Sequence, residues 1–178
     1  MLVGHSFGGA ITTDAATGNP SVKALVYLDA FAPDTAETTT QLVGPTSALA
    51  NPDPTQVFDF VPAALPPTAT TDLYVKADVF PEAFANDLPR REGTLLAATQ
   101  RPVTLGALGE PSTTPAWRTI ASWYEVGTID KVIPAAQQIF MAQRAHARIV
   151  KERTGHLPMI SEPDAVTHLI ETAAHAGS

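Results

Sequence analysis

The sequence predicts an α/β protein built on a parallel sheet with helices packed against it, and three observations predict this class. The apolar run 24–28 (ALVYL) is typical of a strand that is buried on both faces of a parallel sheet. The Gly- and Ala-rich segment 7–17 before it suits a helix packed closely on that sheet, and Gly18-Asn19-Pro20 ends the helix. Residues 116–178 return to the same alternation of strand and helix.

Composition excludes several classes of function. At 178 residues the chain forms one domain or part of one, and 44% hydrophobic with 16% charged residues indicates a globular protein. A net charge of -7 without a Lys/Arg cluster disfavours nucleic acid and anionic membranes as partners. The absence of cysteine excludes disulfides, thiolate metal sites and a Cys nucleophile. No nucleotide or zinc motif, signal peptide or membrane span occurs, so we expect no cofactor, no metal and a cytoplasmic location.

The first chemistry-bearing motif is Gly4-His5-Ser6-Phe7-Gly8, a G-x-S-x-G run between a short apolar strand and the predicted helix. Such a strand–turn–helix presents its serine as a nucleophile, and glycine at 4 and 8 is expected to remove side chains that would clash. The backbone N–H of Phe7, at the helix N-terminus, is the expected oxyanion donor.

The middle segment, 33–115, differs in character from the rest. It is rich in Pro and Thr and lacks the alternation of a strand, and two helices are expected, at 81–88 and 90–99. A structureless loop of this length is unusual inside a domain, so we interpret the segment as a largely helical cap or lid.

The last part of the chain supplies the remaining core elements. We expect a strand at 119–126, a helix at 135–145 and a short strand at 147–150. Ser161-Glu-Pro-Asp164 has the pattern of a capping box, and it precedes a final helix with a regular apolar face. The core is thus predicted to comprise residues 1–32 and 116–178.

A serine nucleophile needs a general base, and His156 is the best candidate. It lies in a loop after the last short strand, at the carboxyl edge of the sheet where sites in open α/β folds form. His5 flanks the nucleophile, but the elbow is expected to turn its side chain away. The other histidines fall in or beside polar helix faces, where a solvated side chain is the simpler interpretation: His146, His168 and His175.

An acid is needed to orient the histidine, and Asp130 follows the predicted strand 119–126 at its carboxyl end. It also satisfies the chain order Ser, acid, His. Asp29 and Asp34, after the preceding strand, are the competing positions. Glu125 lies within a strand and is expected to be structural or solvated.

Taken together, these motifs resemble the α/β-hydrolases, and within them the small esterases related to plant methylesterases and hydroxynitrile lyases. The resemblance implies a catalytic triad of Ser6, Asp130 and His156, with 33–115 as a cap over an acyl or alcohol pocket. The stretches that carry it span most of the chain: GHSFGG (4–9), VYLDAFAP (26–33), AATQRP (97–102), PAWRTIASWYEVGTIDKVIP (115–134) and GHLPMISEPDAV (155–166).

One position separates the branches of this family. The lyases carry a lysine directly after the catalytic histidine, whereas this chain has Leu157. We therefore expect a serine carboxylic-ester hydrolase acting on a small-molecule ester. A lyase, a peroxidase-type enzyme using the same triad, and a non-catalytic ligand-binding protein remain alternatives, whereas Ser6 excludes the hydrolases that use an Asp nucleophile.

In complete relatives, several strands precede the nucleophile, together with the loop that supplies a second oxyanion N–H. We therefore expect this chain to be the C-terminal part of the fold, with reduced or no activity by itself. A fragment or mis-started gene is the favoured explanation, against completion by a partner and against a non-catalytic remnant. An uncovered strand at Met1–Val3 would allow self-association through the sheet edge.

Overall fold

Four parallel strands form the main sheet of the computed structural model, which describes residues 1–176. Their order across the sheet is β1–β2–β6–β7, and each pair is parallel. The strands are β1 (Leu2–His5), β2 (Ala24–Leu28), β6 (Ala121–Gly127) and β7 (Arg148–Glu152). The predicted α/β class with a parallel sheet is therefore confirmed.

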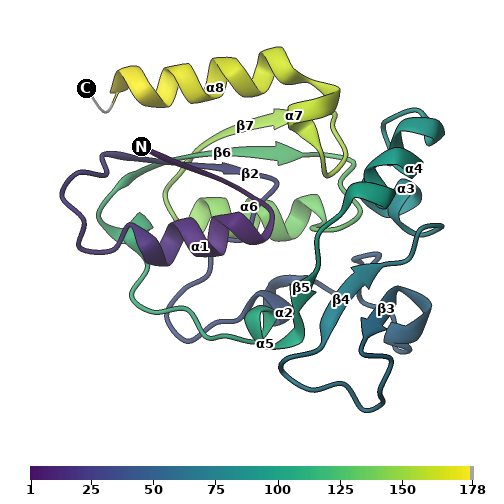
Figure 1. The fold of residues 1–178 in the computed structure, drawn as a ribbon. Helices are drawn as coiled ribbons and strands as arrows, with labels where there is room; N and C mark the ends of the chain where they lie inside the picture. The colour runs from purple at the N-terminus through teal and green to yellow at the C-terminus, as the bar shows by residue number, and fades with distance from the viewer. Residues whose placement is uncertain (177–178) are drawn as a thin grey trace.

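Helices cover both faces of this sheet (Figure 1). On one face, α1 (Phe7–Ala15) and α6 (Ala135–Arg144) pack over Tyr27 and Tyr124, while α8 (Pro163–Ala176) covers Val26 and Trp123 on the other. Successive side chains of a strand point to opposite faces, so a strand covered on both sides is apolar throughout. This explains the unbroken apolar run of β2, all five residues of which are buried.

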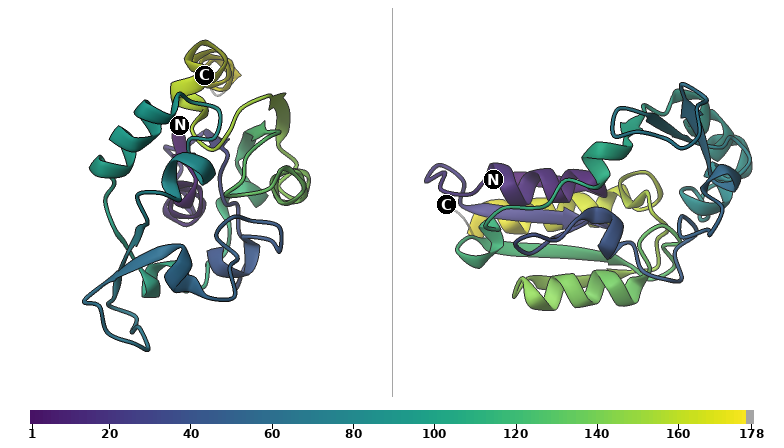
Figure 2. Two further views of the ribbon diagram at one scale, coloured as in Figure 1. Left: turned by 90° about the vertical axis from the view of Figure 1, so that its right-hand side faces the viewer. Right: turned by 90° about the horizontal axis from the view of Figure 1, so that it is seen from below.

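A second, smaller layer lies beyond the carboxyl ends of the main strands (Figure 1 and Figure 2). It contains an antiparallel sheet of β3 (Phe58–Val61), β4 (Asp72–Val75) and β5 (Val103–Thr104). The same layer contains four helices: α2 (Thr39–Leu42), α3 (Phe80–Ala83), α4 (Arg90–Thr99) and α5 (Leu105–Leu108). Single turns complete the structure: η1 (Pro54–Gln56), η2 (Ala116–Arg118) and α7 (Pro158–Ser161).

The expectation that 33–115 lacks strands is wrong. Residues 58–61 do alternate, with Phe58 and Phe60 more buried than their neighbours, but four residues are too few for the pattern to stand out. The helix expected at 81–88 is also too long, since α3 ends at Ala83 and the chain then turns toward the main sheet. The helix expected at 90–99 matches α4.

The capping box expected at Ser161 is also wrong. Ser161 is the last residue of α7, and its hydroxyl donates back to the Leu157 carbonyl at 3.4 Å. The final helix α8 begins at Pro163, because α7 already uses the residues that would have capped it.

Strand β1 forms one edge of the main sheet, and Val3 on it is 43% exposed. Self-association through this edge stays a prediction. Of the helices in the described residues, none has the length and hydrophobicity that crossing a membrane requires.

Candidate active site

Ser6 occupies the tight turn between β1 and α1, at the carboxyl end of the main sheet. Its φ of 51° and ψ of -124° are unusual for a residue with a side chain, and such strain persists only where the surroundings enforce it. Here the Ser6 N–H donates to the Leu28 carbonyl at 3.3 Å, while its own carbonyl accepts from Gly9 and Phe31 N–H at 3.0 and 3.1 Å. The turn therefore holds the hydroxyl clear of both flanking elements.

The glycines that this turn requires are Gly4 and Gly9. A Cβ on Gly4 would lie 2.6 Å from the Gly8 carbonyl oxygen, and one on Gly9 would lie 2.4 Å from the Phe31 carbonyl oxygen. The expectation that Gly8 prevents a clash is wrong, because a Cβ there meets no atom within 4 Å. Gly8 lies on the open side of α1, whereas Gly9 faces the backbone that follows β2.

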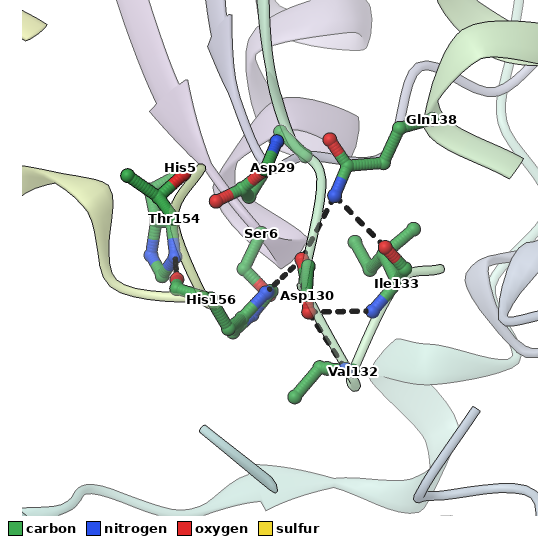
Figure 3. A network of polar contacts seen from close by, with 12 residues as sticks. His5, Ser6, Asp29, Asp130, Val132, Ile133, Gln138, Thr154 and His156 are labelled. Atoms are coloured by element: carbon green, nitrogen blue, oxygen red, sulfur yellow. Dashed lines mark hydrogen bonds and ion pairs between the residues drawn. The ribbon is translucent and has the colours of Figure 1, made fainter. Parts of the chain in front are cut away.

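A continuous chain of hydrogen bonds joins Ser6, His156 and Asp130 (Figure 3). The Ser6 Oγ lies 2.8 Å from His156 Nε2, and His156 Nδ1 lies 2.8 Å from Asp130 Oδ2. Because a carboxylate only accepts, Nδ1 carries the ring proton and Nε2 accepts from the Ser6 hydroxyl. The ring of His156 is fully buried. The structure thus brings together the three side chains expected from the sequence.

Asp130 is held in place by further donors. Its Oδ1 accepts from the N–H groups of Val132 and Ile133 at 2.7 and 3.1 Å, and its Oδ2 accepts from Gln138 Nε2 at 2.8 Å. Gln138 was missed by the sequence analysis. One feature of the sequence could have pointed to it. Gln138 is a polar residue on the apolar face of α6, because it lies three residues before Met141 and four before Ala142.

The competing acids are engaged elsewhere. Asp34 forms an ion pair with Arg118. Asp29 is completely buried and accepts from the Gly127 N–H at 2.5 Å; burial, reinforced by the charges of Glu125 and Asp130, raises the pKa of Asp29 to about 10. Asp29 is therefore a neutral carboxylic acid at pH 7.

Glu125, expected to be structural or solvated, is structural. It is buried within β6, and its Oε1 accepts from the Thr154 hydroxyl at 3.0 Å. Burial raises the pKa of Glu125 to about 7.

His5 contacts the site although the elbow was expected to turn it away. Its Nε2 donates to the backbone carbonyl of His156 at 2.7 Å, and the two rings lie 4.8 Å apart. Burial and, secondly, the neighbouring His156 lower the pKa of His5 to about 3, so its ring stays neutral. The remaining histidines are exposed, as expected: His146, His168 and His175.

A cavity of about 480 Å³ opens over Ser6, between the main sheet and residues 39–108. Six of the seven phenylalanines of the sequence line it: Phe7, Phe31, Phe58, Phe60, Phe80 and Phe84. Most of its polar side chains bond to other parts of the protein, whereas the exposed Arg101 also lines it. Thr39 donates to the Leu108 carbonyl, and the amide of Gln100 bonds to both backbone groups of Val75. Phe7 is the first residue of α1, so its N–H lacks an acceptor within the helix.

This fold and this arrangement of side chains define the class of protein. A model of the alpha/beta hydrolase family matches residues 1–169, and the chain belongs to that family. Among curated proteins, it is 28% identical over 187 residues to the alpha/beta hydrolase nvfD of Aspergillus novofumigatus. That alignment covers 98% of this chain and 69% of the relative.

Solved structures of the same fold include esterases. A pyrethroid hydrolase from Sphingobium faniae JZ-2 superposes with a TM-score of 0.74 at 22% identity, covering 98% of this chain and 70% of that one. A methylesterase from Arabidopsis, MES16, superposes with a TM-score of 0.70 at 16% identity, covering 98% and 69%. The chain therefore spans about 70% of the length of these proteins.

Proposed function

We propose that the protein is a serine carboxylic-ester hydrolase with Ser6, His156 and Asp130 as its catalytic triad. The observation that carries the proposal is the unbroken pair of 2.8 Å hydrogen bonds from Ser6 through His156 to Asp130. The strained backbone of Ser6 and the free N–H of Phe7 support it. The family membership and the esterase neighbours agree with this chemistry.

The reaction follows from the positions of the protons. Ser6 Oγ attacks the ester carbonyl carbon while its proton passes to His156 Nε2, and Asp130 stabilises the imidazolium. The carbonyl oxygen becomes an oxyanion that accepts from the Phe7 N–H. When the intermediate collapses, the C–O bond to the alcohol breaks and the alcohol leaves with the proton from Nε2. A water molecule then repeats these steps on the acyl-serine and releases the acid.

The cavity favours an ester with an apolar group that is aromatic or similarly bulky, and Arg101 in its lining is available to pair with a negative charge. Burying a charge among phenylalanine side chains is costly unless a partner compensates it. Aromatic substrates would instead gain edge-to-face contacts with rings such as Phe80 and Phe84, which themselves stack 4.8 Å apart.

Leu157 supports hydrolysis over the lyase reaction. It is buried in an apolar cluster with Phe80, Ala85 and Ala97, at the position where the lyases carry a lysine. An apolar side chain there provides no cation to stabilise a cyanide leaving group. Cyanide release from mandelonitrile above background would favour the lyase instead.

The test combines hydrolysis of p-nitrophenyl esters with labelling by a fluorophosphonate, which reacts only with an activated serine. Ser6→Ala should abolish labelling and lower kcat by at least about 10⁴-fold. The control is Ser21→Ala, at an exposed serine after α1, which should leave both unchanged. Equal turnover by Ser6→Ala and the unchanged chain would contradict the proposal, as would tight ligand retention by an unchanged chain that neither turns over nor becomes labelled.

A further inference from the structure

The segment between α3 and α4 reaches both loops that carry the proposed base and acid. Asn86 Nδ2 donates to the Ile129 carbonyl at 3.0 Å, one residue before Asp130. Asp87 Oδ2 accepts from the Gly155 N–H at 2.7 Å, one residue before His156. Asn86 and Asp87 thus bond to the backbone of the residues immediately before Asp130 and His156.

The contact with the histidine loop is close. A Cβ at Gly155 would lie 2.5 Å from Asp87 Oδ1 and 2.6 Å from Asn86 Oδ1, so only glycine allows both side chains to approach. Phe84, on the same segment, packs its ring edge-to-face with His156 at 5.2 Å. The segment therefore restrains both the backbone beside His156 and the ring itself.

We propose that Asn86 and Asp87 are positioning residues that fix the spacing between the histidine and the aspartate of the triad. This inference rests on the proposed function. Consecutive Cα atoms are held about 3.8 Å apart by the peptide bond, so two adjacent side chains that each bond to one loop limit the distance between the loops and act as a spacer. The spacing that they set is the one across the 2.8 Å bond from His156 Nδ1 to Asp130 Oδ2.

Neither Asn86 nor Asp87 lines the cavity over Ser6. Their loss should therefore slow the chemical step without weakening substrate binding. A misplacement of about 1 Å in a catalytic group can cost about 100-fold in rate. We expect Asp87→Ala and Asn86→Ala to lower kcat by about 10- to 100-fold, with KM changed by less than about threefold.

Matched variants separate positioning from general destabilisation. Asp87→Asn keeps an oxygen that can accept from Gly155 and should restore most of kcat. Asp78→Ala removes an exposed carboxylate just before α3 and should have no effect, and Asn51→Ala is the corresponding control for Asn86. Rates are expressed per active site, counted by fluorophosphonate labelling, so that unfolded protein does not contribute.

A second measurement reads the spacing without any substrate. In the unchanged protein, the proton on His156 Nδ1 should give a discrete low-field NMR signal, since it is hydrogen-bonded to the buried carboxylate of Asp130. Asp87→Ala and Asn86→Ala should broaden or remove this signal, whereas Asp78→Ala should retain it. A sharp signal together with unaltered kcat in both alanine variants would overturn the inference.

The two proposals fail in different ways. If Ser6 is neither active nor labelled, both in the unchanged chain and in the chain extended by the strands that precede the nucleophile in its relatives, the proposed function fails, and the NMR comparison still tests the spacer. If the unchanged chain is active and Asp87→Asn is as slow as Asp87→Ala, the hydrogen bond to Gly155 is not what positions His156.

Discussion

Gln138 and His156 donate to the same oxygen of Asp130, each at 2.8 Å. Gln138 also donates to the Ile133 carbonyl at 2.8 Å from the same nitrogen, so its amide is fixed between two acceptors. Gln138 thereby holds Asp130 Oδ2 in the position where it accepts from His156.

Replacing Gln138 with leucine should therefore weaken both activity and stability. The variant keeps the side-chain volume but leaves the buried oxygens of Asp130 and Ile133 short of a donor, which costs about 1–3 kcal/mol of unfolding free energy. We expect kcat to fall by about tenfold, since Asp130 Oδ2 loses one of its two donors and is held less firmly toward His156, although Val132 and Ile133 still hold Oδ1. Gln143→Leu, at an exposed position of the same helix, is the control. Ester turnover and urea unfolding measure the two effects, and a normal kcat would show that Asp130 needs no support from α6.

How far the sequence could predict this site is seen by comparing His156 with Gln138. The position of His156 follows from chain order and from its loop at the carboxyl edge of the sheet, and both are local properties of the sequence. Asp87 bonds to the backbone N–H of Gly155, 68 residues away, and every residue has such a group. Gln138 reaches Asp130 and Ile133, eight and five residues before it, only because of how the loop between β6 and α6 folds. Such contacts leave no pattern, except that Gln138 interrupts an apolar helix face.

The same reasoning applies to the fold. The apolar run of β2 reflects burial on two faces, which makes it recognisable. Strands β3, β4 and β5 have four, four and two residues, so their alternation is too short to be distinguished from irregular chain. Their pairing depends on the packing of 33–115 over the main sheet, which propensity alone does not encode.

The partly buried His5 should make the protein less stable in acid. Its folded-state pKa of about 3 lies below the ordinary 6.5, so the unfolded chain binds a proton that the folded chain excludes. The contribution of His5 to stability is therefore lost as pH falls from 6.5 toward 3. His5→Gln retains a donor for the His156 carbonyl without titrating, so urea unfolding should show a weaker decline in this range. His168→Gln, at an exposed site, should follow the unchanged protein. Parallel curves for His5→Gln and the unchanged protein would contradict the prediction.

Asp29 predicts the opposite pH dependence. Its folded-state pKa of about 10 lies above the ordinary 3.8, so the folded chain keeps a proton that the unfolded chain releases. Stability is therefore lost as pH rises between these values. Asp29→Asn mimics the neutral acid and keeps an oxygen for the Gly127 N–H, so its advantage should grow with pH, by up to about 1.4 kcal/mol per unit.

Urea unfolding from pH 5 to 9 measures this difference, with Asp164→Asn at an exposed position of α8 as the control.

Asp29→Asn also tests which carboxylate is the acid of the triad. Asp29→Asn should retain most of kcat, because a neutral side chain already occupies the site at pH 7. A loss as large as that of Asp130→Asn would instead assign the acid to Asp29.

Gly8 and Gly9 provide a matched pair that tests the elbow. A Cβ on Gly9 would collide with the Phe31 carbonyl oxygen at 2.4 Å and the Ala30 Cβ at 2.7 Å, neither of which can move without shifting the backbone. We expect Gly9→Ala to lower the unfolding free energy by about 1–3 kcal/mol. Because the Phe31 N–H also holds the Ser6 carbonyl, the shift should slow Ser6 labelling as well.

Gly8→Ala should behave differently, since its Cβ enters open space and alanine favours the helix over glycine. The expected gain is about 0.5–1 kcal/mol, with Ser6 labelling unchanged. Urea unfolding and the labelling rate distinguish the two variants directly. If both variants label Ser6 at the same rate, the position of Ser6 does not depend on the close approach of α1 to the backbone after β2.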